Sequence, residues 1–125
     1  MKITRFEDIE SWQMARELTR QVYDVTKSHK FSKDFGLKDQ ICRASVSVMS
    51  NIAEGFDSGS RAEFARFLSY AQRSCSEVQS QLYVALDQHY LAIKTFDEVY
   101  MLTGNASSKI GAFIKYLKQQ KTKTQ

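Results

Sequence analysis

The chain has 125 residues, of which 42% are hydrophobic and 26% charged, and it contains no proline and two cysteines. This composition fits one globular domain with a buried core, and it excludes disordered, collagen-like and disulfide-dense proteins. The formal net charge of +4 is unevenly placed: residues 1–98 carry 13 basic and 14 acidic groups (net −1), whereas residues 99–125 carry five lysines and no acid (net +5).

The first two predicted helices cover residues 7–28 and 37–54. Apolar residues recur at steps of three and four along one face of the first: Trp12, Ala15, Leu18, Val22 and Val25. The break between the helices is the least periodic part of the chain, and we expect its Phe31 and Phe35 to pack the loop down. Gly55 is expected to end the second helix in the left-handed conformation.

The third and fourth predicted helices cover residues 60–89 and 95–119. Each begins with a sequence typical of a capping box, Ser60 with Glu63 and Thr95 with Glu98. An apolar seam follows in both helices, which also favours helical structure. Gly104 and Gly111 lie near the seam of the fourth helix, where they are expected to allow close approach of another helix.

Four amphipathic helices joined by short loops predict an all-α fold, an antiparallel up-and-down four-helix bundle formed by a single domain of residues 1–125. Proline is absent, which agrees with a helical chain because proline is poorly tolerated inside helices. No apolar run reaches the roughly 18 residues that a membrane span requires. We therefore expect a soluble, cytoplasmic protein with no membrane association.

The second and third predicted helices have more apolar surface than one core-facing stripe requires. The additional residues are Val46, Met49 and Ala53 in the second helix, and Phe67, Tyr70, Tyr83, Leu86 and Tyr90 in and after the third. One interpretation is self-association through these faces. The alternative is that these side chains line a wide bundle core.

A polar line also follows the second helix, and its members are Gln40, Arg43, Ser47, Asn51 and Glu54. Glu54 falls in the last predicted turn, where the helix dipole disfavours an acid. We therefore expect a compensating partner, such as Arg16, Arg73 or the backbone N–H groups that open the third helix. The alternative is a solvated glutamate near a frayed end.

The most specific motif of the chain is Asn51-Ile52-Ala53-Glu54-Gly55. The opening, residues 6–16, and the third-helix segment 73–82 add further matches. These segments resemble the bacterial four-helix-bundle family named after 23S rRNA intervening sequences, over nearly the whole chain. The prolines that the family usually has near Ser32 and at the position of Met49 are absent here.

The resemblance implies a ring-shaped homopentamer. It also implies a genomic association, because some members are encoded within insertions in ribosomal RNA genes. Similar basic bundles are accessory proteins of diversity-generating retroelements, where they contact a reverse transcriptase and nucleic acid. No enzymatic activity is implied. The matching motif positions, expected to be structural or interface residues, are Gln40, Ser47, Asn51, Ile52, Ala53, Glu54, Gly55 and Ser60.

The sequence contains no recognisable catalytic, metal or cofactor motif. Cys42 and Cys75 fall at near-core positions of helices, which favours buried, inert thiols. Neither His29 nor His89 has a glutamate three residues before it, as bundle metal sites require. We expect no enzyme activity, no metal and no cofactor.

The basic residues of the C-terminal part form the best candidate for nucleic-acid contacts. These are Lys109, Lys115, Lys118, Lys121 and Lys123, and Arg66 and Arg73 of the third helix are expected to extend the patch. The alternative is a lysine-rich terminus that only aids solubility. The sequence thus predicts a non-enzymatic homo-oligomeric scaffold that binds RNA or DNA and a partner protein, for which the resemblance implies a reverse transcriptase. The alternative function is a purely structural or protein-interaction oligomer with no nucleic-acid role.

Overall fold

The computed structural model describes the backbone of residues 2–123 and the side chains of residues 2–119. It contains four α-helices: α1 (Glu10–Val25), α2 (Phe35–Asp57), α3 (Arg61–Asp87) and α4 (Ile93–Lys123). Two short 3-10 helices, η1 (Phe6–Asp8) and η2 (Phe31–Lys33), precede α1 and α2. No strand occurs among the described residues, so the predicted all-α class and its four helices are confirmed.

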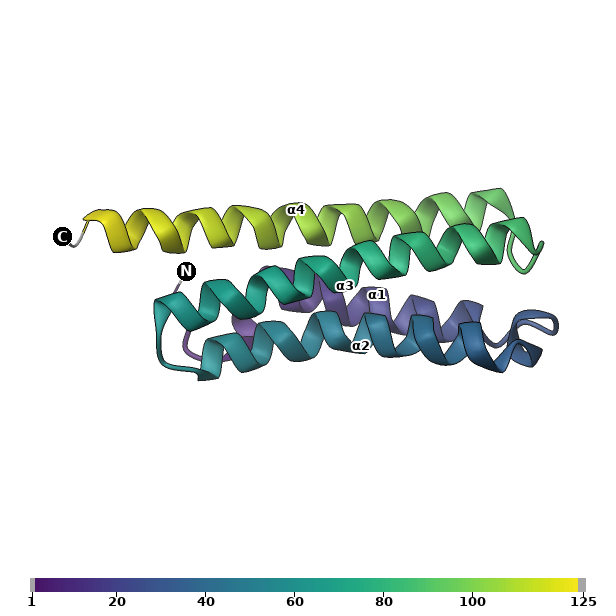
Figure 1. Ribbon diagram of the computed structural model, residues 1–125, viewed down its shortest axis with the longest axis horizontal. Helices are drawn as coiled ribbons and strands as arrows, with labels where there is room; N and C mark the ends of the chain where they lie inside the picture. Colours follow the sequence, from purple (N-terminus) through teal and green to yellow (C-terminus); the bar gives the residue numbers. More distant parts are fainter. Residues whose placement is uncertain (1, 124–125) are drawn as a thin grey trace.

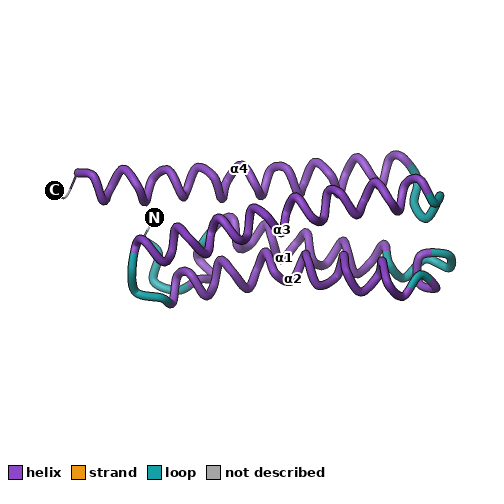
Figure 2. The backbone as a smooth tube through the Cα atoms, viewed as in Figure 1, coloured by secondary structure: helices purple, strands orange, loops and turns teal. Residues whose placement is uncertain are grey.

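The helices run up and down, with their connections at the two ends of the bundle (Figure 2). α2 packs between α1 and α3, and α4 packs on α3 and α1. The C-terminal part of α4 extends past the ends of the other helices (Figure 1). Among the described residues, none of the helices combines the length and the apolar composition that a membrane span requires.

The core consists of two clusters, one towards each end of the bundle. The cluster that includes Leu18, Ile41, Leu82 and Phe96 lies towards the α1–α2 connection. The other includes Ile52, Leu68, Ile110 and Leu117, and lies towards the α2–α3 connection. Burial of the apolar side chains of the two clusters stabilises the packing of the four helices. Its contribution to the free energy of folding is about 25 cal/mol per Å² of apolar surface removed from water.

Of the two phenylalanines in the predicted break between the first two helices, only one packs against the core of the bundle. Phe31 is fully buried and its ring stacks on Tyr90 at 5.2 Å between centroids. Phe35 is 77% exposed, so the expectation that it packs the loop down is wrong. It is the first residue of α2, which begins earlier than predicted because the Asp34 carboxylate accepts a hydrogen bond from the Leu37 N–H at 3.1 Å.

Gly55 does not end α2, contrary to the prediction. The helix continues to Asp57, and the glycine with a left-handed φ of 76° is Gly59, in the connection that follows. A Cβ at Gly55 would lie 2.9 Å from Phe64 Cδ1 and 2.9 Å from Phe67 Cβ. Gly55 is therefore required by the close approach of α3 and not by backbone conformation.

The predicted start of α3 is confirmed and that of α4 is wrong. The Ser60 hydroxyl accepts a hydrogen bond from the Glu63 N–H at 3.3 Å, as an N-cap does. The Glu63 carboxylate pairs with Arg66, so only the Ser60 half of the predicted capping box forms. α4 begins two residues before Thr95, and the Phe96 N–H already bonds to the Ala92 carbonyl at 2.9 Å. The second predicted capping box therefore does not form, because Thr95 lies inside the first turn.

The two glycines of α4 differ in the space around them. A Cβ at Gly111 would lie 2.8 Å from Gln72 Nε2, whereas one at Gly104 would have its nearest neighbour at 3.5 Å, an ordinary contact. Gln72 uses this space to donate a hydrogen bond from Nε2 to the Ser107 carbonyl at 3.0 Å. The Gln72 side chain therefore occupies the space that a Cβ at Gly111 would need, whereas Gly104 has room for a Cβ.

The additional apolar residues of α2 and α3 divide between the core and the surface. Met49, Leu86 and Tyr90 pack against the core clusters. Val46 is 39% exposed and Tyr83 is 49% exposed, with its ring against Phe96 at 5.0 Å. A wide core thus accounts for some of these side chains, and the others remain on the surface of the single chain.

Candidate functional site

The candidate nucleic-acid residues of α3 and α4 lie on neighbouring helices. The Phe64 and Phe113 rings are 5.0 Å apart, and Gln72 bonds to Ser107, so the first half of α3 runs antiparallel beside the second half of α4. Arg66 and Arg73 are exposed on α3, and Lys115 and Lys118 are exposed on α4. We refer to these four residues together as the basic surface.

Tyr70 lies between the two arginines of this surface. The Arg66 and Arg73 guanidinium carbons are 5.7 Å and 5.5 Å from the centre of the Tyr70 ring, within the range of cation–π attraction. Arg66 also donates to the Tyr70 hydroxyl at 3.1 Å and pairs with the Glu63 carboxylate. In the sequence, Tyr70 stands out only as a surplus apolar residue. The signal for its contacts is the spacing Arg66, Tyr70, Arg73, which puts the three side chains on one helix face.

Of the three remaining candidate lysines, Lys109 alone has a side chain that the structure describes. Lys109 faces α1, where its ammonium group is 3.3 Å from the Glu10 carboxylate. Lys121 and Lys123 lie outside the residues whose side chains are described. Lys109 therefore lies outside the basic surface, because the alternating steps of three and four that follow one helix face do not connect it to Lys115 and Lys118.

Two of the motif residues of α2, Gln40 and Ser47, line a groove between α2 and α3. The Ser74 hydroxyl donates to the Ser47 hydroxyl at 2.9 Å, and Asn51 Nδ2 donates to the Ser47 carbonyl at 2.9 Å. Among the other motif residues, Ile52 lies in the core and Ser60 caps α3. These contacts give several motif positions a structural role within one chain.

The same groove continues towards the start of α2 as two adjoining hollows of about 490 Å³ and 300 Å³. Gln40, Glu77 and Gln81 line both hollows. The Gln81 Oε1 atom is buried and has no hydrogen-bond partner among the described residues. Arg43, at the rim, is held by Asp39 at 2.9 Å. We refer to these two hollows together as the α2–α3 groove.

Glu54 has no compensating partner in the chain. It is exposed, and among the described residues it makes no hydrogen bond or ion pair, with Arg16, Arg73 or any backbone N–H group. The predicted pairing is wrong, and the alternative of a solvated carboxylate holds. The physical reason is that water at an exposed helix end screens the dipole.

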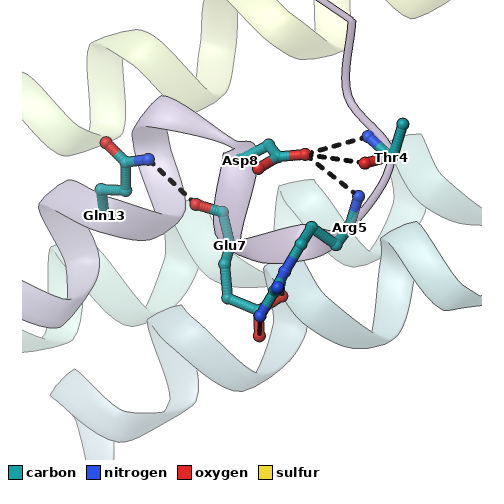
Figure 3. Close-up of polar contacts among 5 residues, drawn as sticks. All are labelled: Thr4, Arg5, Glu7, Asp8 and Gln13. Atoms are coloured by element: carbon teal, nitrogen blue, oxygen red, sulfur yellow. Dashed lines mark hydrogen bonds and ion pairs between the residues drawn. The ribbon is translucent and has the colours of Figure 1, made fainter.

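The opening segment of the chain is tied to the start of α1 by polar contacts (Figure 3). Asp8 Oδ2 accepts hydrogen bonds from the Thr4 N–H at 3.0 Å and from the Arg5 N–H at 3.3 Å. The Thr4 N–H bond is the main reason that the pKa of Asp8 lies below its usual value. Gln13 Nε2 donates to the Glu7 carbonyl at 2.9 Å, which fixes η1 against α1.

Both cysteines are free and buried. Burial raises the pKa of the Cys75 thiol to about 12 and also raises that of Cys42. Thiols with raised pKa values are poor nucleophiles at neutral pH. Among residues 2–119, no three His, Cys, Asp or Glu side chains are grouped as a metal site would need.

The comparisons with known proteins agree with this architecture. The family model of the 23S rRNA-intervening sequence protein matches residues 7–112. A crystal structure of a protein of unknown function from the S23 ribosomal protein family of Bacteroides thetaiotaomicron superposes with a TM-score of 0.76 at 20% identity, over 84% of this chain and 98% of that one. At this identity the likeness shows the fold alone. No match is found among curated proteins.

Proposed function

The chain belongs to the 23S rRNA-intervening sequence protein family, and on that premise we propose that it is a non-enzymatic, homo-oligomeric helical scaffold that binds RNA or DNA through its basic surface. The observation that supports the binding role is that Arg66 and Arg73 of α3, and Lys115 and Lys118 of α4, are all exposed on two adjacent helices. Arg73 and Lys115 make no ion pair among the described residues, so their charges are available to phosphates.

Assembly would multiply this positive surface. The family resemblance favours a ring-shaped homopentamer, in which five basic surfaces would be held on one particle. Clustered cations raise the local potential and release more counterions on binding than one surface can. The same particle would offer repeated docking positions to a partner protein, and a reverse transcriptase is the candidate that the family resemblance provides.

A purely structural or protein-interaction oligomer is the second candidate. Two observations favour it: Glu63 pairs with Arg66, and Glu10 pairs with Lys109, so part of the positive charge is already neutralised within the chain. Under this function the four charges of the basic surface would contribute to solubility only.

RNA binding, measured by fluorescence anisotropy at increasing salt concentration, distinguishes the nucleic-acid-binding scaffold from the purely structural oligomer. We expect single-stranded RNA to bind with an affinity that falls as salt rises, and a variant with R66A, R73A, K115A and K118A to bind more weakly and with a shallower salt slope, by about 0.7 per lost phosphate contact. Affinity that is indifferent to salt, or equal in the variant, contradicts the binding role.

The matched control removes four positive charges from the opposite end of the bundle, through K30A, K33A, K38A and K94A. This variant has the same net charge as the first one, so an effect of net charge alone would weaken RNA binding equally in both variants.

The oligomer is tested separately by light scattering, which should give about five times the 14.4 kDa of one chain. A mass of 14.4 kDa at all concentrations excludes the ring.

A further inference from the structure

The α2–α3 groove has unsatisfied hydrogen-bond acceptors and an apolar end. The buried Gln81 Oε1 atom has no donor, and the exposed Glu77 carboxylate makes no ion pair among the described residues. Leu37 and Val84 line the far part of the groove, and Val84 is 45% exposed. A complementary occupant therefore brings a positively charged group to Glu77 and an apolar group to Val84, and a hydrogen-bond donor to which Gln81 can turn its buried amide oxygen. Nucleic acid does not fit, because its phosphates would meet a carboxylate.

The outer face of α1 carries these groups. Arg16, Arg20 and Tyr23 are exposed and follow one another at steps of four and three. Arg16 makes no ion pair or hydrogen bond among the described residues, and Arg20 is held by Glu17. Tyr23 is 45% exposed. Within one chain α1 packs on α2 and α4, and this stripe faces away from the groove, so the two can meet only between copies.

The spacing of the two sets is the same. Arg16, Arg20 and Tyr23 of α1 stand at i, i+4 and i+7, as do Glu77, Gln81 and Val84 of α3. At 1.5 Å rise per residue, each set spans about 10 Å along its helix. Two helices placed side by side in parallel would therefore align all three pairs at once: a guanidinium with a carboxylate, a guanidinium with an amide oxygen, and a phenol ring with an apolar side chain.

We propose that the α2–α3 groove of one copy binds the α1 face of a second copy, with Arg16 against Glu77, Arg20 against Gln81 and Tyr23 against Val84. This inference rests on the proposed homo-oligomer and says which surfaces form it. The two surfaces are different, so the contact is heterologous, and a heterologous contact repeats around a ring.

The test is charge reversal followed by light scattering. E77R and R16E each place two like charges opposite one another, and each is expected to convert the oligomer into a monomer of 14.4 kDa. The double variant R16E/E77R restores opposite charges in reversed order and is expected to recover the wild-type mass. Circular dichroism confirms that each variant is folded, which the exposure of both residues favours.

Two further variants keep the result interpretable. E98R makes the same charge change on an exposed carboxylate of α4 outside both surfaces, and it should leave the mass unchanged. Y23S removes an exposed ring without a charge change and should weaken assembly at least tenfold.

The possible outcomes separate this inference from the proposed function. If the wild-type protein is oligomeric and both single reversals stay oligomeric, or if the double variant is not restored, the groove contact is wrong while the oligomer stands. If the wild-type protein is monomeric, the oligomer and this interface both fail, and the nucleic-acid role is still judged by its own measurement.

Discussion

Gly55 of α2 lies against Phe67 of α3 so closely that a Cβ added to the glycine would be 2.9 Å from the Phe67 Cβ. The Phe64 carbonyl oxygen would be 3.2 Å away, so backbone as well as side chain blocks the position. G55A should therefore force the two helices apart and lower the free energy of unfolding by about 1–3 kcal/mol, even though alanine is the better helix former. Urea denaturation measures the change.

G104A is the matched control for this substitution, since Gly104 also lies inside a helix. The nearest atom to its added Cβ would be Gln79 Nε2 at 3.5 Å, which is an ordinary contact. We expect G104A to raise the free energy of unfolding by roughly 0.5–1 kcal/mol, because alanine loses less backbone entropy than glycine. Equal effects of the two substitutions would show that the approach of α2 and α3 does not decide the residue at position 55.

His89 ends α3 in a conformation that favours glycine. Its φ is 62°, and the bonds from the Tyr90 N–H to the Ala85 carbonyl at 2.9 Å and from the His89 N–H to the Leu86 carbonyl at 3.0 Å complete a Schellman motif. H89G should stabilise the protein by about 1 kcal/mol, because a side chain with this φ is strained. Q88G is the comparison, since Gln88 has a φ of −85° and gains nothing from glycine. Thermal melting that ranks the two variants the other way round would contradict the argument.

Asp34 joins two distant parts of the chain. One carboxylate oxygen caps α2 through the Leu37 N–H at 3.1 Å, and the other accepts a hydrogen bond from the Tyr90 hydroxyl at 2.9 Å. D34A should lower the free energy of unfolding by about 1 kcal/mol through loss of the cap alone. D34N, whose side chain can still cap, should lose less, and Y90F should lower the melting temperature without affecting the cap. If D34A and D34N are equally unstable, the cap is not the cause.

The contacts of Asp8 predict a pH dependence of stability. The hydrogen bonds from Thr4 and Arg5 hold the folded-state pKa of Asp8 below its usual value of 3.8. A carboxyl group with a depressed folded-state pKa stabilises the protein above its unfolded pKa, and this contribution is lost as the pH falls through the folded value. The difference in melting temperature between the wild-type protein and D8N should therefore be larger at pH 6 than at pH 2.

The control for Asp8 is E98Q, which removes one carboxylate that makes no hydrogen bond or ion pair among the described residues. The comparison separates the loss of a charge from the loss of the Thr4 and Arg5 contacts. A D8N difference that is constant across the pH range would contradict the prediction.

The sequence by itself determined the helices and which face of each is buried. Residues such as Leu18, Ile52, Leu68 and Ile110 repeat at the helical period, and all four are fully buried. The Ser60 cap could also be read locally, because a cap depends on residues within one turn. The family could be identified in the same way, from the motif around Asn51 and Gly55.

The tertiary structure decided what depends on a second helix. From the sequence, Gly55 was predicted to end the helix. A glycine can be required either by a left-handed backbone conformation or by close packing, and the sequence alone does not distinguish the two. The position of Phe67 shows that close packing applies to Gly55. Lys109 turned towards Glu10, because this contact depends on which side of α4 meets α1. Periodicity gives the direction of a side chain relative to its own helix, whereas the partner it meets depends on how the four helices are arranged around the core.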